Sequence, residues 1–141
     1  MRVLNRHDIK KLEEHWINHN ENIKRLKYRE WELMSKNSDD ENSGGGSNSV
    51  RQVSKPTEQL AIRLMEDELH RNLTTIIRVV EKLYKELDED TTSIVNMRYW
   101  CSSRDFMEWE DIAFELGMTR SKVLRMRNSL LDETARLIGY V

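Results

Sequence analysis

The most constraining feature of this sequence is a central run of apolar residues that recur at alternating steps of four and three. The run consists of Leu69, Leu73, Ile76, Val80, Leu83 and Leu87, preceded by Ile62. Such spacing keeps the side chains on one stripe of an α-helix, as in a coiled-coil seam. Residues 56–88 are therefore expected to form one long helix. Its seam needs an apolar partner, which the sequence leaves open between another part of the chain and a second copy.

A second helical pattern precedes this one. Apolar residues at three- and four-residue spacing predict a helix over residues 8–36, with Asp8 as its N-cap, in an N-terminal region that covers 1–36. Trp31 lies off the apolar stripe and is the best candidate for an exposed partner contact. Residues 37–55 are rich in Gly, Ser and Asn and are expected to form a flexible linker.

The C-terminal region, residues 89–141, has three shorter helical patterns in tight succession. They cover about residues 91–100, 108–116 and 120–138. No segment alternates with a period of two for long enough to predict a strand. The expected fold class is all-α, with long coiled-coil-like N-terminal and central helices followed by a C-terminal helix-turn-helix domain.

The helix-turn-helix prediction depends on the spacing Ala113, three residues, Gly117, five residues, Val123. Ala113 is small enough to let a second helix cross close by. Gly117 can adopt the positive φ that ends the first helix, and Thr119 can cap the second. Met118 is expected to fill the apolar space between the two. The alternative is an ordinary helical hairpin with a glycine turn.

Charge is segregated around this motif. The stretch Thr119–Leu131 holds four basic and no acidic residues, although residues 90–141 together hold seven basic and eight acidic ones. Basic side chains on one helix suit both phosphates and base edges in a DNA groove. The predicted DNA-binding residues are Thr119, Arg120, Ser121, Lys122, Arg125, Arg127 and Asn128.

These residues are expected to have different roles. Arg120 and Arg125 are the candidates for guanine edges, which a guanidinium can bind through two hydrogen bonds. Ser121 and Asn128 are candidates for base or phosphate contacts, and the side chains expected on phosphates are Lys122 and Arg127.

Two resemblances follow from these motifs. Met97-Arg98-Tyr99 is followed by a short loop, by Trp109 and then by the Ala113–Val123 motif. This order resembles the region-4 helix-turn-helix of bacterial sigma factors. The resemblance implies a phosphate contact for either Arg98 or Arg104. The whole layout resembles the RinA/ArpU-type phage transcriptional regulators, most specifically over residues 88–131. This resemblance implies a sequence-specific activator of phage late genes, those for packaging and structural proteins. It implies promoter DNA as a partner, with the recognition role on Thr119, Arg120, Ser121, Lys122, Arg125 and Asn128. Contact with host RNA polymerase and homo-oligomerisation are further expectations.

Composition excludes several other classes. The net charge of −2 argues against a protein that coats nucleic acid through bulk charge. Cys101 is the only cysteine, and His15 and His19 lack a third ligand, so no metal is expected. No set of side chains converges for catalysis, so we expect neither an enzyme nor a cofactor. No apolar run would span a membrane, so a cytoplasmic protein is expected. The resemblance implies that this is the cytoplasm of a bacterial host cell, with association to its nucleoid.

Two rival functions stay open. A phage small terminase subunit also combines a helix-turn-helix with oligomerising helices, but commonly in the reverse order. A modulator of RNA polymerase or of a sigma factor would use the C-terminal helices for protein contacts without binding DNA. The acid-free Thr119–Leu131 segment favours DNA over this second alternative.

Overall fold

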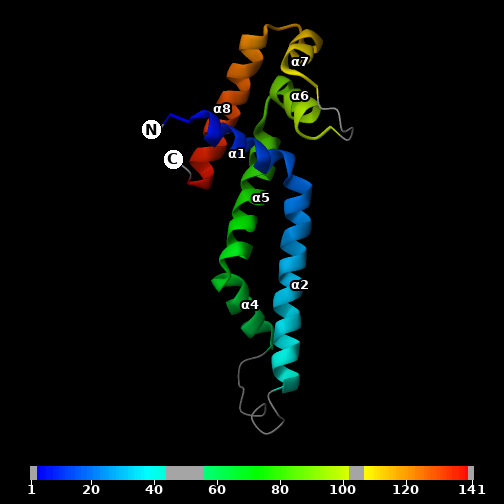
Figure 1. The fold of residues 1–141 in the computed structure, drawn as a ribbon, viewed down its shortest axis with the longest axis vertical. Helices are drawn as coiled ribbons and strands as arrows, with labels where there is room; N and C mark the ends of the chain where they lie inside the picture. The colour runs from blue at the N-terminus through cyan, green and yellow to red at the C-terminus, as the bar shows by residue number, and fades with distance from the viewer. Residues whose placement is uncertain (1–2, 44–55, 102–106, 140–141) are drawn as a thin grey trace. The chain divides into compact units, whose positions relative to one another are not determined.

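A computed structural model describes residues 3–43, 56–101 and 107–139, and this part of the chain is entirely helical (Figure 1). The all-α class is therefore confirmed for the described residues, which contain no strand. The helices are α1 (Arg6–Ile17), α2 (His19–Ser43), α4 (Pro56–Glu66), α5 (Glu68–Glu86), α6 (Glu89–Arg98), α7 (Trp109–Leu116) and α8 (Arg120–Ile138). None of these helices is long and apolar enough to cross a membrane.

The chain divides into two compact units. The terminal unit comprises Met1–Asn20 together with Ile76–Val141, and the middle unit comprises Glu21–Thr75. The terminal unit contains the predicted DNA-binding segment, and the middle unit contains the first part of the apolar seam.

The N-terminal helical pattern is divided into two helices rather than forming the single helix expected over 8–36. Helix α1 starts two residues earlier than predicted, because Asn5 is its N-cap and Asp8 is the reciprocal partner in a capping box. The helix ends at Asn18. The carbonyl of Trp16 accepts a hydrogen bond of 2.8 Å from the indole N–H of Trp100, and this contact with a distant residue accompanies the break.

The central pattern is divided as well, at Asp67, so residues 56–88 form α4 and α5 instead of one helix. The Asp67 carboxylate accepts a hydrogen bond of 2.8 Å from the backbone N–H of His70 and thereby caps α5. The linker expected over 37–55 falls partly within α2, which continues to Ser43, and residues 44–55 lie outside the described part of the chain.

The core of the terminal unit brings α1 onto the C-terminal helices. Trp16 is fully buried, and its indole N–H donates to the Thr134 hydroxyl at 3.1 Å. The buried members of this cluster are Leu12, Trp16, Val79, Val80, Leu83, Val95, Tyr99, Leu130, Leu131 and Ala135. The N-terminal helix therefore packs on the same chain's α8, and the second half of the seam is buried in an intramolecular core.

The middle unit is held by ion pairs as well as by apolar contacts. The Arg29 guanidinium donates two hydrogen bonds to the Asp67 carboxylate, at 2.6 and 3.0 Å. His70 Nε2 lies 3.0 Å from a carboxylate oxygen of Glu30. Leu73 of the seam is buried here, but Leu69 is half exposed. The first half of the seam is thus only partly covered within the middle unit.

Candidate nucleic-acid interface

The turn between α7 and α8 has the backbone conformation that the sequence predicts. Gly117 adopts φ 66° and ψ 35°, in the left-handed region that glycine favours. The backbone N–H of Met118 donates to the carbonyl of Ala113 at 3.0 Å, which closes the end of α7. A Cβ atom added to Gly117 would meet nothing within 4 Å. Glycine is therefore required here by backbone conformation and not by lack of space.

The start of α8 is fixed by Thr119. Its hydroxyl accepts a hydrogen bond of 3.1 Å from the backbone N–H of Lys122, as the N-cap prediction requires. The first turn of α8 contains no acidic residue. The positive end of the helix dipole and the basic side chains therefore lie at the same end of α8.

A small apolar cluster fixes the angle between α7 and α8. Ile112 and Val123 are fully buried in it, together with Ala113 and with Ile94 of α6. Met118 packs against this cluster, as predicted, and so do Leu116 and Met126. These contacts position α8 without using its predicted DNA-binding face.

Six of the seven predicted DNA-binding residues are exposed in the structure. They are Thr119, Arg120, Ser121, Lys122, Arg125 and Asn128. Ser121, Arg125 and Asn128 fall on the side of α8 opposite the buried Val123 and Leu130, with Lys122 beside them, as helical periodicity requires. Thr119 and Arg120 are exposed at the start of the helix. We call the accessible surface that these six residues form the α8 basic face.

The cations of the α8 basic face have few competing partners. Arg120 Nε lies 3.5 Å from a carboxylate oxygen of Glu110, and both side chains are more than half exposed. Such a surface pair contributes only about 0–1 kcal/mol, so a stronger acceptor can displace it. No described carboxylate forms an ion pair with Lys122 or Arg125. The Glu110 contact was not considered in the sequence analysis, which examined the helix alone.

Arg127, the seventh predicted residue, is oriented differently. Its side chain is 16% exposed, and Nη1 lies 3.9 Å from a carboxylate oxygen of Glu13 in α1. The guanidinium carbon also lies 5.3 Å from the centre of the Trp109 ring, and two of its nitrogens donate to the side-chain oxygen of Asn128. Arg127 therefore connects α8 to α1 and α7, and its predicted phosphate contact would require it to leave these partners.

Arg98, a further phosphate candidate, is not on this surface either. Arg98 Nη1 donates to the carbonyl of Met107 at 2.8 Å, and its guanidinium carbon lies 4.6 Å from the centre of the Trp109 ring. Arg104 lies outside the described residues. Trp109 thus contacts two guanidinium groups, a stabilising arrangement that the sequence analysis did not identify.

Glu13 receives a second contact from the C-terminal region. The hydroxyl of Tyr99 donates to its carboxylate at 2.6 Å. Burial and the adjacent carboxylate raise the pKa of Tyr99, so this hydroxyl stays a hydrogen-bond donor at neutral pH. The Glu13 carboxylate is therefore the point where α1 meets both Tyr99 and Arg127, and it helps to hold α8 in place.

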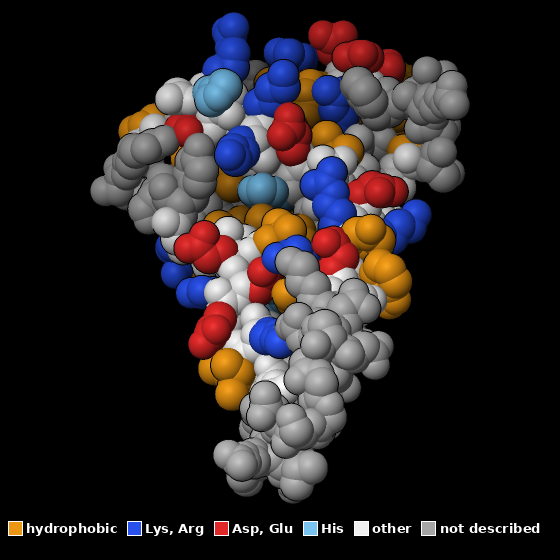
Figure 2. Space-filling view, turned by 60° about the horizontal axis from the view of Figure 1, so that its bottom comes forward, with side chains coloured by type: hydrophobic (Ala, Val, Ile, Leu, Met, Phe, Trp, Pro, Cys, Tyr) orange, Lys and Arg blue, Asp and Glu red, His pale blue; other side chains and the backbone are white. Residues whose placement is uncertain are grey.

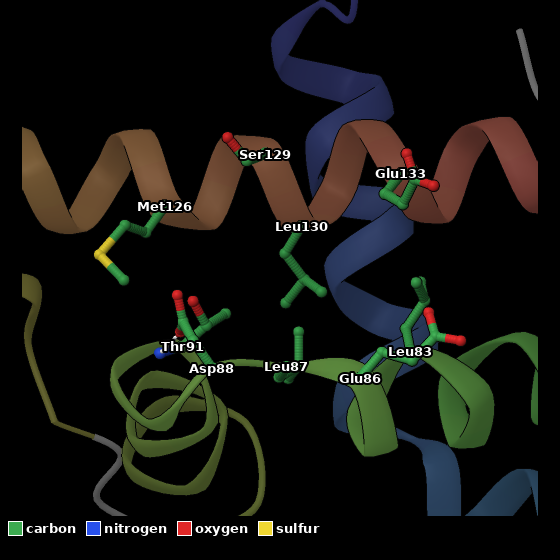
Figure 3. Close-up of a pocket in the computed structure, with 9 residues that line it drawn as sticks. All are labelled: Leu83, Glu86, Leu87, Asp88, Thr91, Met126, Ser129, Leu130 and Glu133. Atoms are coloured by element: carbon green, nitrogen blue, oxygen red, sulfur yellow. Dashed lines mark hydrogen bonds between the residues drawn. The ribbon is translucent and has the colours of Figure 1, made fainter.

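A cavity of about 410 Å³ lies on another side of α8 (Figure 3). Figure 3 shows Met126, Ser129, Leu130 and Glu133 of α8 above the segment that joins α5 to α6. The other lining residues are Leu83 and Glu86 of α5, Leu87 and Asp88 of the joining segment, and Thr91 of α6. Three of the nine lining residues are acidic and none is basic. This side of α8 is therefore unsuited to phosphates, which leaves the α8 basic face as the candidate interface.

The described residues form an all-helical fold whose last helix, α8, is capped at both ends and presents basic side chains to solvent. A family described as a protein of unknown function (DUF722) matches residues 9–136, and the chain belongs to this family. The comparison with curated proteins gave no match, and neither did the comparison with solved structures.

Proposed function

We propose that this protein is a sequence-specific DNA-binding transcriptional activator that reads promoter DNA with a helix-turn-helix formed by α7 and α8. The single observation that supports this most is the α8 basic face, an exposed and acid-free surface on a helix with a fixed start. A helix of this kind fits the major groove, which is about 12 Å wide. The first residues of α8 would then contact base edges, while other side chains of the α8 basic face contact phosphates.

The energetics of the face support base reading by Arg120 and Arg125. A bidentate guanidinium–guanine contact contributes about 1–3 kcal/mol of discrimination against the wrong base. Leaving Glu110 costs Arg120 about 1 kcal/mol at most. Arg125 has no described carboxylate to leave. Base contacts by these two side chains would therefore displace few ion pairs of the described residues.

The resemblance to RinA/ArpU-type regulators supports the more specific part of the proposal. In that reading the target promoter drives the late genes of a phage, and the bound protein acts with host RNA polymerase. Arg127 is left out of the proposed contacts, because its guanidinium is half-buried against Glu13 and Trp109.

The test is selection of binding sites from sheared phage and host DNA by the purified full chain. Salt at about 150 mM removes most weak, sequence-independent binding. We expect one intergenic site upstream of a late operon to be enriched, and the enrichment to disappear with Arg120→Ala or Arg125→Ala. Arg136→Ala is the matched control, because Arg136 is on the same helix with a similarly exposed side chain, 58% against 55% for Arg120.

The same experiment separates the rival functions. Enrichment within a packaging gene would favour a small terminase subunit. An absence of any enriched site, with and without RNA polymerase, would contradict DNA reading and favour a protein-binding modulator. Equal loss of enrichment in the Arg136→Ala control would also contradict the proposal, because the effect would then reflect total charge and not the α8 basic face.

A further inference from the structure

The middle unit exposes large apolar side chains on α2 and on α4–α5. Besides Met34, which is 52% exposed, these residues and their exposed fractions are Tyr28 60%, Trp31 59%, Ile62 52%, Met65 76% and Leu69 51%. Figure 2 shows hydrophobic side chains at the surface beside charged side chains of both signs. Isolated exposed apolar residues are ordinary, but a contiguous set of this size marks an interaction surface.

Several observations place these side chains on one side of the middle unit. Tyr28 lines a groove of about 310 Å³ together with Leu69 and Leu73. The Tyr28 and Trp31 rings are in contact, with centroids 5.7 Å apart. Ile62, Met65 and Leu69 lie three and four residues apart, and backbone hydrogen bonds of 3.0 Å continue through Asp67 between the two helices. Ile62, Met65 and Leu69 therefore lie along one stripe, which includes the first part of the seam.

We propose that a second copy of this chain covers this surface, so that two middle units form an antiparallel four-helix bundle. Each middle unit is a pair of helices joined through Arg29–Asp67 and Glu30–His70, and such a pair buries only the stripe between its helices. Two such pairs bury their remaining apolar sides by packing against each other. This inference does not depend on the proposed DNA binding.

The area of the surface fits a dimer. The five side chains together expose roughly 700 Å², close to the roughly 800 Å² that each partner contributes to a standard protein–protein interface.

The charges at the rim favour a second copy over a partner of one charge. Arg25 is exposed one turn before Tyr28, at one end of the groove, beside Lys24, which lies 3.5 Å from a carboxylate oxygen of Glu21. Glu66 is exposed just before Leu69, and Glu32, one turn after Tyr28, lies 3.5 Å from Arg29. A two-fold axis across the groove places the basic end of one copy against the acidic end of the other. A uniformly acidic or basic partner would meet repulsion at one of the two ends.

Sedimentation equilibrium of the full chain from about 1 to 100 µM covers the range of Kd expected for an interface of this size. We expect twice the mass of the 16.9 kDa chain for the wild type and a single-chain mass for Leu69→Asp. Phe114→Asp is the matched control, because Phe114 is 85% exposed but belongs to α7 in the terminal unit, and it should remain dimeric. Tyr28→Lys, at a more exposed position, gives a second dissociating variant should Leu69→Asp lose helical circular dichroism.

A single-chain mass for the wild type at 100 µM would overturn the inference, and so would any assembly other than two copies. Dissociation of Phe114→Asp, with Leu69→Asp and Tyr28→Lys both dimeric, would overturn it too. A dissociated variant keeps the α8 basic face, so it should still bind one half-site of the selected DNA. Loss of dimerisation is therefore measured separately from loss of DNA reading.

Discussion

The same substitution at two neighbouring arginines of α8 should have different effects: Arg127→Ala should lower the stability of the fold, and Arg125→Ala should lower the affinity for DNA. Arg127 is 16% exposed and contacts Glu13, Trp109 and Asn128, whereas Arg125 is exposed and has no described ion-pair partner. Arg127→Ala removes one partner of a partly buried ion pair and one cation–π contact. These interactions contribute roughly 1.5 and 0.5 kcal/mol respectively, so we expect a loss of about 2 kcal/mol in the free energy of unfolding.

That loss corresponds to a fall in Tm of roughly 8 °C for a domain of this size. Arg125→Ala should stay within about 0.5 kcal/mol of the wild type, because surface substitutions rarely exceed that value. The assay is urea unfolding of both variants, followed by circular dichroism at 222 nm. The DNA affinity of folded Arg127→Ala should change by less than that of Arg125→Ala.

The reverse pattern would contradict a structural role for Arg127. If Arg127→Ala unfolds at the wild-type urea concentration and loses DNA affinity as strongly as Arg125→Ala does, Arg127 contacts DNA and its interior contacts contribute little. A loss of stability in Glu13→Gln as large as in Arg127→Ala would support the shared ion pair, since the two atoms belong to one contact.

Three further predictions follow from the structure. Gly117→Ala should lower the free energy of unfolding by about 1–2 kcal/mol, because the Cβ has open space but the φ of 66° is strained for alanine. Gly139→Ala, at φ 88° and with equal space, should lower it by a similar amount in urea unfolding without lowering DNA affinity. Burial lowers the pKa of His19 despite the nearby Glu81, and burial with Lys11 lowers that of His15. The folded state disfavours protonation of both histidines, so their contribution to stability should be full above the ordinary pKa of 6.5 and should be lost as pH falls below it. His19→Gln should therefore flatten the dependence of the urea midpoint on pH. The hydrogen bond from Arg29 lowers the pKa of Asp67 to about 2. The ionised Asp67 should therefore stabilise the fold fully above the ordinary pKa of 3.8, and this stabilisation should be lost as pH falls towards 2. In acid titrations followed by circular dichroism, Asp67→Asn should not show this loss.

The parts of the fold set by local chemistry could be predicted from the sequence. The boundaries of α8 agree with the expected 120–138 because Thr119 caps its start and Gly139 its end, and both act within a few residues. The Gly117 turn and the burial of Val123 follow from similarly short-range spacing.

The parts set by contacts between distant residues could not be predicted. The breaks at Asn18 and Asp67 occur without proline or glycine, and each coincides with a contact from another part of the fold, from Trp100 and Arg29 respectively. The orientation of Arg127 depends on Glu13, which is more than one hundred positions away in the sequence. Helical spacing places Arg127 four residues after Val123 and three before Leu130, on the buried side of α8, but it does not identify Glu13 as the partner. Six of the seven predicted residues are exposed and the seventh is not.

The central claim is that Arg120 and Arg125 read base edges in the major groove, and guanine methylation interference tests it most directly. Methylation at N7 blocks the acceptor that an arginine uses on guanine. At the selected site, we expect methylation of one or two guanines in each half-site to weaken binding of the wild type. Methylation at one of these guanines should no longer weaken binding of Arg120→Ala, and methylation at another should no longer weaken binding of Arg125→Ala. Binding that is insensitive to N7 methylation but weakened equally by both substitutions would contradict the claim, because the two arginines would then contact only the phosphate backbone.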